Sequence, residues 1–145
     1  MKRVLFLCTG NSCRSQMAEG WARHFGRLEP YSAGIETQGL NPHAVAVMRE
    51  AGVDISAQRS QLASELAAVE LDLVVTVCDH AAESCPAFPS RVRKLHAGFA
   101  DPPRLAAGED DPQRALDHYR RVRDEIRAFV ERLPDQLETN LEDPQ

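Results

Sequence analysis

Short runs of apolar residues alternate along the chain with stretches in which apolar residues recur every three or four positions. Val4–Leu7 is one continuous apolar run, and residues 71–78 (LDLVVTVC) form the strongest one. Continuous runs of this length are typical of strands that are buried on both faces, as in a parallel sheet. Weaker patterns at residues 30–35 and 93–99 predict further strands.

Helical periodicity separates these runs. From Ser15 to Phe25 the apolar residues fall on one face of a helix, and the glycine that follows is a typical helix end. Residues 41–52 begin with an asparagine cap followed by proline, which predicts a second helix. Further helices are expected at residues 60–66 and 111–133.

Strands that alternate with helices predict an α/β fold, here a three-layer sandwich with a mostly parallel central sheet and helices on both faces. Residues 1–133 are expected to form a single domain. Residues 134–145 are polar and acidic and are expected to form a frayed tail. Because ligands of such sheets bind beyond the carboxyl ends of the strands, the search for a site begins where the apolar runs end.

Composition narrows the classes of function. The chain has 145 residues, of which 43% are hydrophobic and 27% charged, as is ordinary for one globular domain. The net charge of −5 argues against nucleic acid as a partner, although a focused pocket can still bind a small anion. No apolar run is long enough to cross a membrane or to form a signal-peptide core. We expect a cytoplasmic monomer with no membrane partner.

The loop after the first strand, CTGNSCRS, carries residues that suit an anion. Its small residues let backbone N–H groups turn inward, and the helix that follows adds its positive end. Gly10 permits a positive φ, and Asn11 tolerates one. Arg14 offers a two-pronged donor for a tetrahedral oxyanion. Cys8 would then be a thiolate nucleophile, because nearby cations and helix N-termini lower the pKa of a thiol.

We therefore predict a phosphate-binding loop after the first strand. Its candidate substrate-binding residues are Thr9, Gly10, Asn11, Ser12, Cys13 and Arg14. The hydroxyls of Ser12 and Ser15 are candidate donors to the Cys8 sulfur, and Ser15 is counted with the catalytic residues. Cys13 is expected to pack under the loop, and Asn11 to shape it through its side-chain hydrogen bonds.

The sequence CTGNSCRS resembles the phosphate-binding loop of the low-molecular-weight tyrosine phosphatase fold, which thioredoxin-coupled arsenate reductases share. The resemblance to those reductases extends from Lys2 to about Leu133. It implies that Cys8 attacks arsenate, that Cys78 attacks the Cys8 sulfur as arsenite leaves, and that Cys85 then attacks Cys78. It also implies that thioredoxin reduces the final disulfide, and that the protein serves arsenical resistance.

The residues alone leave alternatives open at this second cysteine pair. Cys78 and Cys85 are redox thiols, buried fillers or half of a zinc site, for which His80 is the only further candidate nearby. A low-molecular-weight protein tyrosine phosphatase would need neither thiol. A reductase that forms a mixed disulfide with a small thiol, and an oxyanion sensor without turnover, are further alternatives.

A general acid is expected late in the chain, because a departing oxygen leaves more easily when it is protonated. The family has an Asp-Pro pair in a late loop, and Asp101-Pro102 matches it. With Cys8 and Arg14, Asp101 would complete the machinery of either enzyme. Pro103 stands where phosphatases of this fold carry an aromatic residue that stacks on the substrate ring.

No metal and no organic cofactor is expected, since the thiols carry the electrons of a reductase. Some relatives bind a potassium ion near the loop, and three of its ligand positions are matched here by Asn11, Glu19 and Ser32. A carboxylate is expected as the fourth ligand, but Gln61 stands at that position, which argues against the ion.

Overall fold

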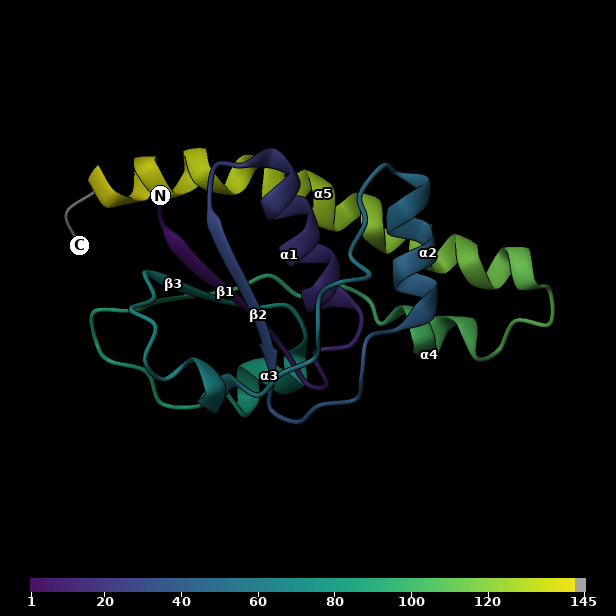
Figure 1. Cartoon of the computed structure of the whole chain (residues 1–145), viewed down its shortest axis with the longest axis horizontal. Helices are drawn as coiled ribbons and strands as arrows, with labels where there is room; N and C mark the ends of the chain where they lie inside the picture. The colour runs from purple at the N-terminus through teal and green to yellow at the C-terminus, as the bar shows by residue number, and fades with distance from the viewer. Residues whose placement is uncertain (143–145) are drawn as a thin grey trace.

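The computed structural model describes residues 1–142 of the chain, and side chains as far as residue 138. Its centre is a sheet of four parallel strands in the order β2-β1-β3-β4 (Figure 1). The strands are β1 (Arg3–Cys8), β2 (Glu29–Gly34), β3 (Leu73–Thr76) and β4 (Arg93–His96). The two central strands, β1 and β3, are buried almost throughout, which explains why both are continuous apolar runs in the sequence.

Helices cover both faces of this sheet. They are α1 (Arg14–Phe25), α2 (Pro42–Glu50), the 3₁₀ helix η1 (Ala63–Leu66), α3 (Asp79–Glu83), α4 (Pro102–Ala106) and α5 (Pro112–Glu142). In the strand order, the connection through α1 leads from β1 to β2 on one side. The later connections lead the opposite way, first from β2 to β3 and then from β3 to β4. Because such connections are right-handed, α1 lies on one face and η1 and α3 on the opposite face. The α5 helix packs along α1 (Figure 1), so the predicted three-layer α/β fold is confirmed.

Local sequence signals account for the observed helix ends. Gly26 follows α1 in the left-handed conformation, with φ of 72°. The Asn41 side chain caps α2 by accepting hydrogen bonds from the backbone N–H groups of His43 and Ala44, at 2.8 and 3.2 Å. Both helix ends were predicted from the sequence. Glycine adopts the left-handed conformation after a helix at little cost, and an asparagine side chain can accept hydrogen bonds from the first free N–H groups of a helix.

The last helix does not end at Leu133, as the sequence predicts, but continues to Glu142. Pro134 lies inside it, although proline removes a helical hydrogen bond. The buried stripe continues past this point, since Leu133, Pro134 and Leu137 are all buried. Burial of that face therefore outweighs the proline, and the predicted frayed tail is corrected to helix over residues 134–142. Residues 143–145 lie outside the described residues.

Candidate active site

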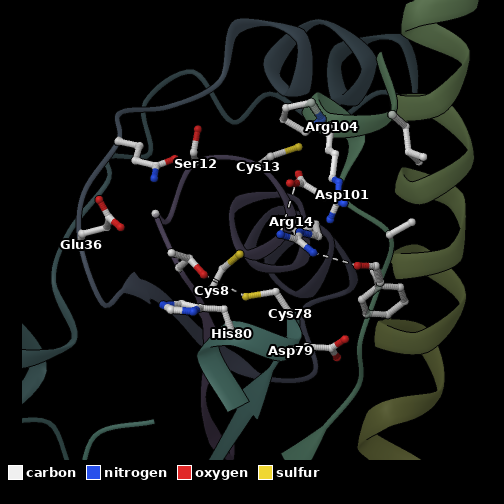
Figure 2. Close-up of a pocket in the computed structure, with 17 residues that line it drawn as sticks. Cys8, Ser12, Cys13, Arg14, Glu36, Cys78, Asp79, His80, Asp101 and Arg104 are labelled. Atoms are coloured by element: carbon white, nitrogen blue, oxygen red, sulfur yellow. Dashed lines mark hydrogen bonds and ion pairs between the residues drawn. The ribbon is translucent and has the colours of Figure 1, made fainter. Parts of the chain in front are cut away.

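A cavity of about 780 Å³ opens at the carboxyl ends of β1 and β3, where the sequence predicted a ligand to bind (Figure 2). Cys8 and Cys78 lie next to each other in it, with Arg14 and Asp101 nearby. The remaining lining residues are Thr9, Gly10, Ser12, Cys13, Glu36, Gln38, Asp79, His80, Phe99, Ala100, Pro103, Arg104 and Leu105. The structure thus brings together residues from the first loop, from the segment after β3 and from the Asp101 loop.

The loop from Cys8 to Cys13 is held by its carbonyl groups. Each of them accepts a hydrogen bond, and the donors are the backbone N–H groups of Ile35, Glu36, Gln38, Asn41 and Met17 and the side chains of Gln16 and Ser60. By contrast, the N–H groups of residues 10–14 donate to no acceptor within residues 1–142. A loop that turns its carbonyls outward leaves its amides available to an anion.

Asn11 fixes the bend of this loop. Its φ is 47°, and it is the only residue other than glycine with a positive φ in the described part of the chain. Its side chain is buried, with Nδ2 donating to Ser15 Oγ at 2.9 Å and Oδ1 accepting from the Gln61 N–H at 2.8 Å. Asn11 does not line the cavity, and its contacts agree with a loop-shaping role.

Glycines at two positions allow the loop to pack closely. Gly10 does not adopt the positive φ that the sequence suggested; instead, a Cβ there would collide with the Gln38 side chain. A Cβ on Gly34, at the end of β2, would collide with the Glu36 carbonyl oxygen and would lie 2.9 Å from both the Asn11 nitrogen and the Thr9 carbonyl oxygen. Lack of space beside the backbone therefore accounts for Gly34.

Arg14 is fixed in position by the segment that carries the predicted acid. Its Nη1 donates to the Phe99 carbonyl oxygen at 2.8 Å, and its Nη2 lies 3.8 Å from Asp101 Oδ1 (Figure 2). Its Nε is buried and has no partner in the described structure. An unpaired donor buried at the edge of an anion cavity is one that a bound oxyanion can satisfy.

The thiols of Cys8 and Cys78 interact and titrate as a pair. Their interaction is the main cause that lowers the pKa of Cys78 to about 5 and raises the pKa of Cys8. Burial adds to the rise at Cys8, and Arg14 opposes it. Cys78 also accepts the Ala81 N–H at 3.4 Å and lies 3.3 Å from Thr9 Oγ1. These donors favour the thiolate form of Cys78.

This proton distribution reverses the sequence-based expectation that Cys8 is the thiolate. The expectation considered the loop and Arg14, which do lower the pKa of Cys8, but not a second sulfur in contact with it. Burial and the donated proton outweigh the arginine in this structure.

Two further residues of the loop differ from their predicted places. Cys13 lines the cavity rather than packing beneath the loop, and burial raises its pKa to about 12. Ser15 is fully buried and lies outside the cavity lining, where its hydroxyl oxygen accepts from Asn11. No hydrogen bond between Ser15 and the Cys8 sulfur occurs in the described structure. Ser12 lines the cavity.

Cys85 lies apart from the other reactive thiols. It is half-buried, does not line the cavity, and is separated from Cys78 by α3. A disulfide between Cys78 and Cys85 would close a loop that contains the whole of α3. Only Ala81 is buried among the residues of this helix.

The candidate potassium ligands lie close together, but their oxygens are already paired. Ser32 Oγ donates to Glu19 Oε1 at 2.6 Å, and Arg23 Nη1 donates to Glu19 Oε2 at 2.8 Å. Gln61 donates from its N–H to Asn11 Oδ1 at 2.8 Å and from its side chain to the Ser32 carbonyl at 2.9 Å. Arg23 therefore supplies a positive charge beside Glu19 in this structure.

Sequence analysis missed several residues around the cavity. The Phe99 carbonyl holds Arg14, but a backbone oxygen leaves no signal in residue type. Glu36 and Arg104 line the cavity and were not among the predicted residues. Arg104 lies three residues after Asp101 in the sequence, and this short spacing was the available signal for a second cation near the predicted acid.

Comparison with known proteins places these observations in a family. The family model described as low molecular weight phosphotyrosine protein phosphatase matches residues 3–143. The arsenate reductase of Halalkalibacterium halodurans is 52% identical over 127 residues, which cover 86% of this chain and 89% of that protein. No helix in residues 1–142 is long and apolar enough to span a membrane.

Solved structures agree with this match. An arsenate reductase in its oxidized state superposes with a TM-score of 0.74 at 31% identity, covering 94% of this chain and 98% of that one. The YwlE arginine phosphatase from Geobacillus stearothermophilus superposes with a TM-score of 0.72 at 28% identity, covering 100% of this chain and 99% of its own. The fold therefore occurs in both reductases and phosphatases.

Proposed function

The chain belongs to the low molecular weight phosphotyrosine protein phosphatase family, and from this premise we propose that it reduces arsenate to arsenite through a cysteine relay that thioredoxin regenerates. The contact between the Cys8 and Cys78 thiols in an anion-binding cavity carries the proposal. A hydrolase needs only the first thiol, whereas a reductase needs both. Relatives named arsenate reductase, at 52% and 51% identity, support the activity.

The first step forms a bond between sulfur and arsenic. Arsenate binds with its oxygens toward Arg14 and the N–H groups of residues 10–14. Cys8 passes its proton to Cys78 across their hydrogen bond, and its thiolate attacks the arsenic. As the S–As bond forms, one As–O bond breaks, and Asp101 protonates the departing oxygen, which leaves as water. Arsenic remains in the +5 state.

The second and third steps are thiol exchanges. Cys78 releases its proton to solvent and attacks the Cys8 sulfur, so that an S–S bond forms and the S–As bond breaks. The electron pair of that bond stays on arsenic, which leaves as arsenite in the +3 state. Cys85 then attacks Cys78, and Cys8 leaves as a thiolate. The dithiol of thioredoxin reduces the Cys78–Cys85 disulfide.

The decisive experiment is arsenate-dependent oxidation of NADPH in the presence of thioredoxin and its reductase. The Cys85→Ser variant is expected to release one arsenite per enzyme and then stop with Cys8 joined to Cys78. Its neighbour Ser84, exposed at the end of α3, provides a control, because Ser84→Ala keeps all three thiols. Continued turnover by Cys85→Ser would remove Cys85 from the relay, and turnover with glutathione alone would favour a small-thiol route.

The size of the cavity supports phosphatase activity as a second candidate. At about 780 Å³ it is far larger than a tetrahedral oxyanion and leaves room for the rest of a phosphoester. Cys8, Arg14 and Asp101 would perform this hydrolysis without the other thiols. Hydrolysis of p-nitrophenyl phosphate tests it, with Cys8→Ser as the inactive variant. Binding of arsenate without either turnover would favour an oxyanion sensor.

The relay requires neither a metal nor an organic cofactor, because each electron pair moves between sulfur atoms or onto arsenic. The pairing of Glu19 with Arg23 supports activity that does not depend on potassium. A cytoplasmic location follows from the same chemistry, since the relay begins from reduced thiols. The four cysteines are free in this structure.

A further inference from the structure

A chain of hydrogen bonds bridges the segment that carries Cys78. His96, the last residue of β4, has its Nδ1 2.8 Å from Thr76 Oγ1 and its Nε2 3.0 Å from Asp79 Oδ1. Thr76 ends β3, and Asp79 begins α3. The imidazole ring therefore joins the two residues that flank Val77 and Cys78, and it ties both to the edge of the sheet.

The backbone passes close to this bridge. A Cβ on Gly98 would lie 3.0 Å from His96 Nε2 and 3.3 Å from Asp79 Oδ1, closer than most side-chain contacts. The same segment is bonded to the residue that follows β3, because the Phe99 N–H donates to the Val77 carbonyl at 3.1 Å. The ring therefore lies beside the start of α3 and the segment that leads to the acid loop.

The bonding pattern determines which ring nitrogen carries a proton. A carboxylate only accepts hydrogen bonds, so Nε2 must donate to Asp79. Nδ1 then accepts from the Thr76 hydroxyl in the neutral ring and donates to it in the charged ring. The bridge therefore persists in both charge states. The His96 and Asp79 side chains are 42% and 89% exposed, so the bridge adds little to overall stability and acts mainly on position.

We propose that His96 is a positioning residue that keeps the Cys78 sulfur against Cys8 by holding Thr76 and Asp79 in place. This inference rests on the proposed relay. Cys78 caps α3, which has five residues and is too short to persist without such support. The exchange that releases arsenite needs the two sulfurs to meet in line, and small displacements of reacting atoms slow such steps strongly.

The test compares variants in the Cys85→Ser background, in which release of one arsenite reports the Cys78 attack. Thr76→Val removes the hydroxyl with little change in volume, and Thr76→Ser retains it. His96→Ala and Thr76→Val are expected to slow arsenite release by about tenfold, and Thr76→Ser to retain the parent rate. Hydrolysis of p-nitrophenyl phosphate uses Cys8 and forms no bond to Cys78, so its rate is expected to change much less than the rate of arsenite release.

The outcomes separate a positioning role from a structural one. An equal loss of both activities would show that His96 only supports the fold, and an unchanged rate of arsenite release in His96→Ala would overturn the proposal. If the parent Cys85→Ser protein releases no arsenite, it is the relay that fails. Hydrogen exchange of the Ala81 amide tests the bridge without arsenate. Exchange is expected to be faster in Thr76→Val than in Thr76→Ser, and equal exchange in the two would contradict the bridge.

Discussion

The two segments that carry the reactive sulfurs are held in very different ways. In the loop from Cys8 to Cys13, every carbonyl is bonded to the surrounding protein, and Asn11 and Ser15 behind it are fully buried. In the segment from Cys78 to Cys85, one short helix buries a single residue, and Cys85 lies only half-buried beyond its end.

This difference matches the two tasks that the relay requires. The loop must present a fixed set of donors to a small anion, because preorganised amides lose no free energy to rearrangement when the anion binds. In the proposed relay, the second segment must let Cys85 reach Cys78. Segments with few buried contacts open at low free energy, so the weak packing of α3 suits it to this change.

The largest expected effects come from replacing the Cys8 and Cys78 thiols, which are expected to differ in the activities that they abolish. Cys8→Ser is expected to abolish both arsenate reduction and hydrolysis of p-nitrophenyl phosphate, by about 10³-fold or more, because both begin with this nucleophile. Cys78→Ser is expected to abolish only the reduction. Parallel steady-state assays of the two activities measure the split. Hydrolysis that survives in Cys8→Ser would place the nucleophile elsewhere.

A substitution at the end of β2 is expected to disturb the packing of the loop from Cys8 to Cys13. Gly34→Ala places a methyl group against the loop backbone and is expected to destabilise the fold by about 1–3 kcal/mol and to weaken phosphate binding. Gly108→Ala is the matched control, since a Cβ there meets nothing within 4 Å. Thermal unfolding with and without phosphate measures both effects. Equal unfolding temperatures for the two variants would mean that the loop is not held by this contact.

The lowered pKa of Cys78 predicts that a thiolate forms at acidic pH. Thiolate absorbance at 240 nm is expected to appear with a midpoint near pH 5, the pKa of Cys78. Because this pKa lies below the ordinary value of 9.0, the Cys78 thiolate stabilises the fold increasingly from pH 5 to pH 9. The contribution is lost as the pH falls through 5. Cys78→Ser is expected to remove the transition, and its persistence in that variant would assign the thiolate to another cysteine.

A smaller effect is expected from loosening α3 alone. Ala82→Gly, at an exposed position, lowers the helix stability by about 1 kcal/mol and is expected to speed the transfer of the disulfide to Cys85. Ala46→Gly makes the same change at an exposed position of α2 and serves as the control. Rapid quenching followed by mass analysis of the disulfides measures the transfer. A slower transfer in Ala82→Gly would mean that α3 guides Cys85 rather than delaying it.

The smallest expected effect concerns the support behind the loop. Exchanging sodium for potassium is expected to leave both the rate and the unfolding temperature unchanged, because Arg23 already neutralises Glu19. Arg23→Ala is expected to create a response to potassium. A potassium response in the unaltered protein would show that the ion displaces the arginine.

Features set by local sequence were predictable, whereas those set by distant contacts were not. The strand, loop and helix around Cys8 follow from apolar runs and from turn and cap residues, and the structure has them where predicted. The continuation of α5 past Pro134 was missed because it depends on a buried face. The short helices α3 and α4 were missed because five residues show no period.

The candidate site shows the same division. The apolar runs and the loop after the first strand pointed to Cys8, Arg14 and Cys78, and the family resemblance pointed to Asp101. All four residues line one cavity. The location of the proton between two sulfurs, by contrast, depends on contacts between residues far apart in sequence, as does the bonding of Ser15 to Asn11 rather than to Cys8.

The unpaired amides of residues 10–14 also bear on how arsenate is told apart from its competitors. They recognise tetrahedral shape and negative charge, which inorganic phosphate offers equally well, so phosphate is expected to occupy the loop and compete for it. Selectivity would then arise after binding: phosphorus(V) does not accept an electron pair from a thiolate-bound adduct, and arsenic(V) does. The concentration of phosphate in the cell would set the apparent affinity for arsenate. Of the two bound anions, only arsenate would be reduced.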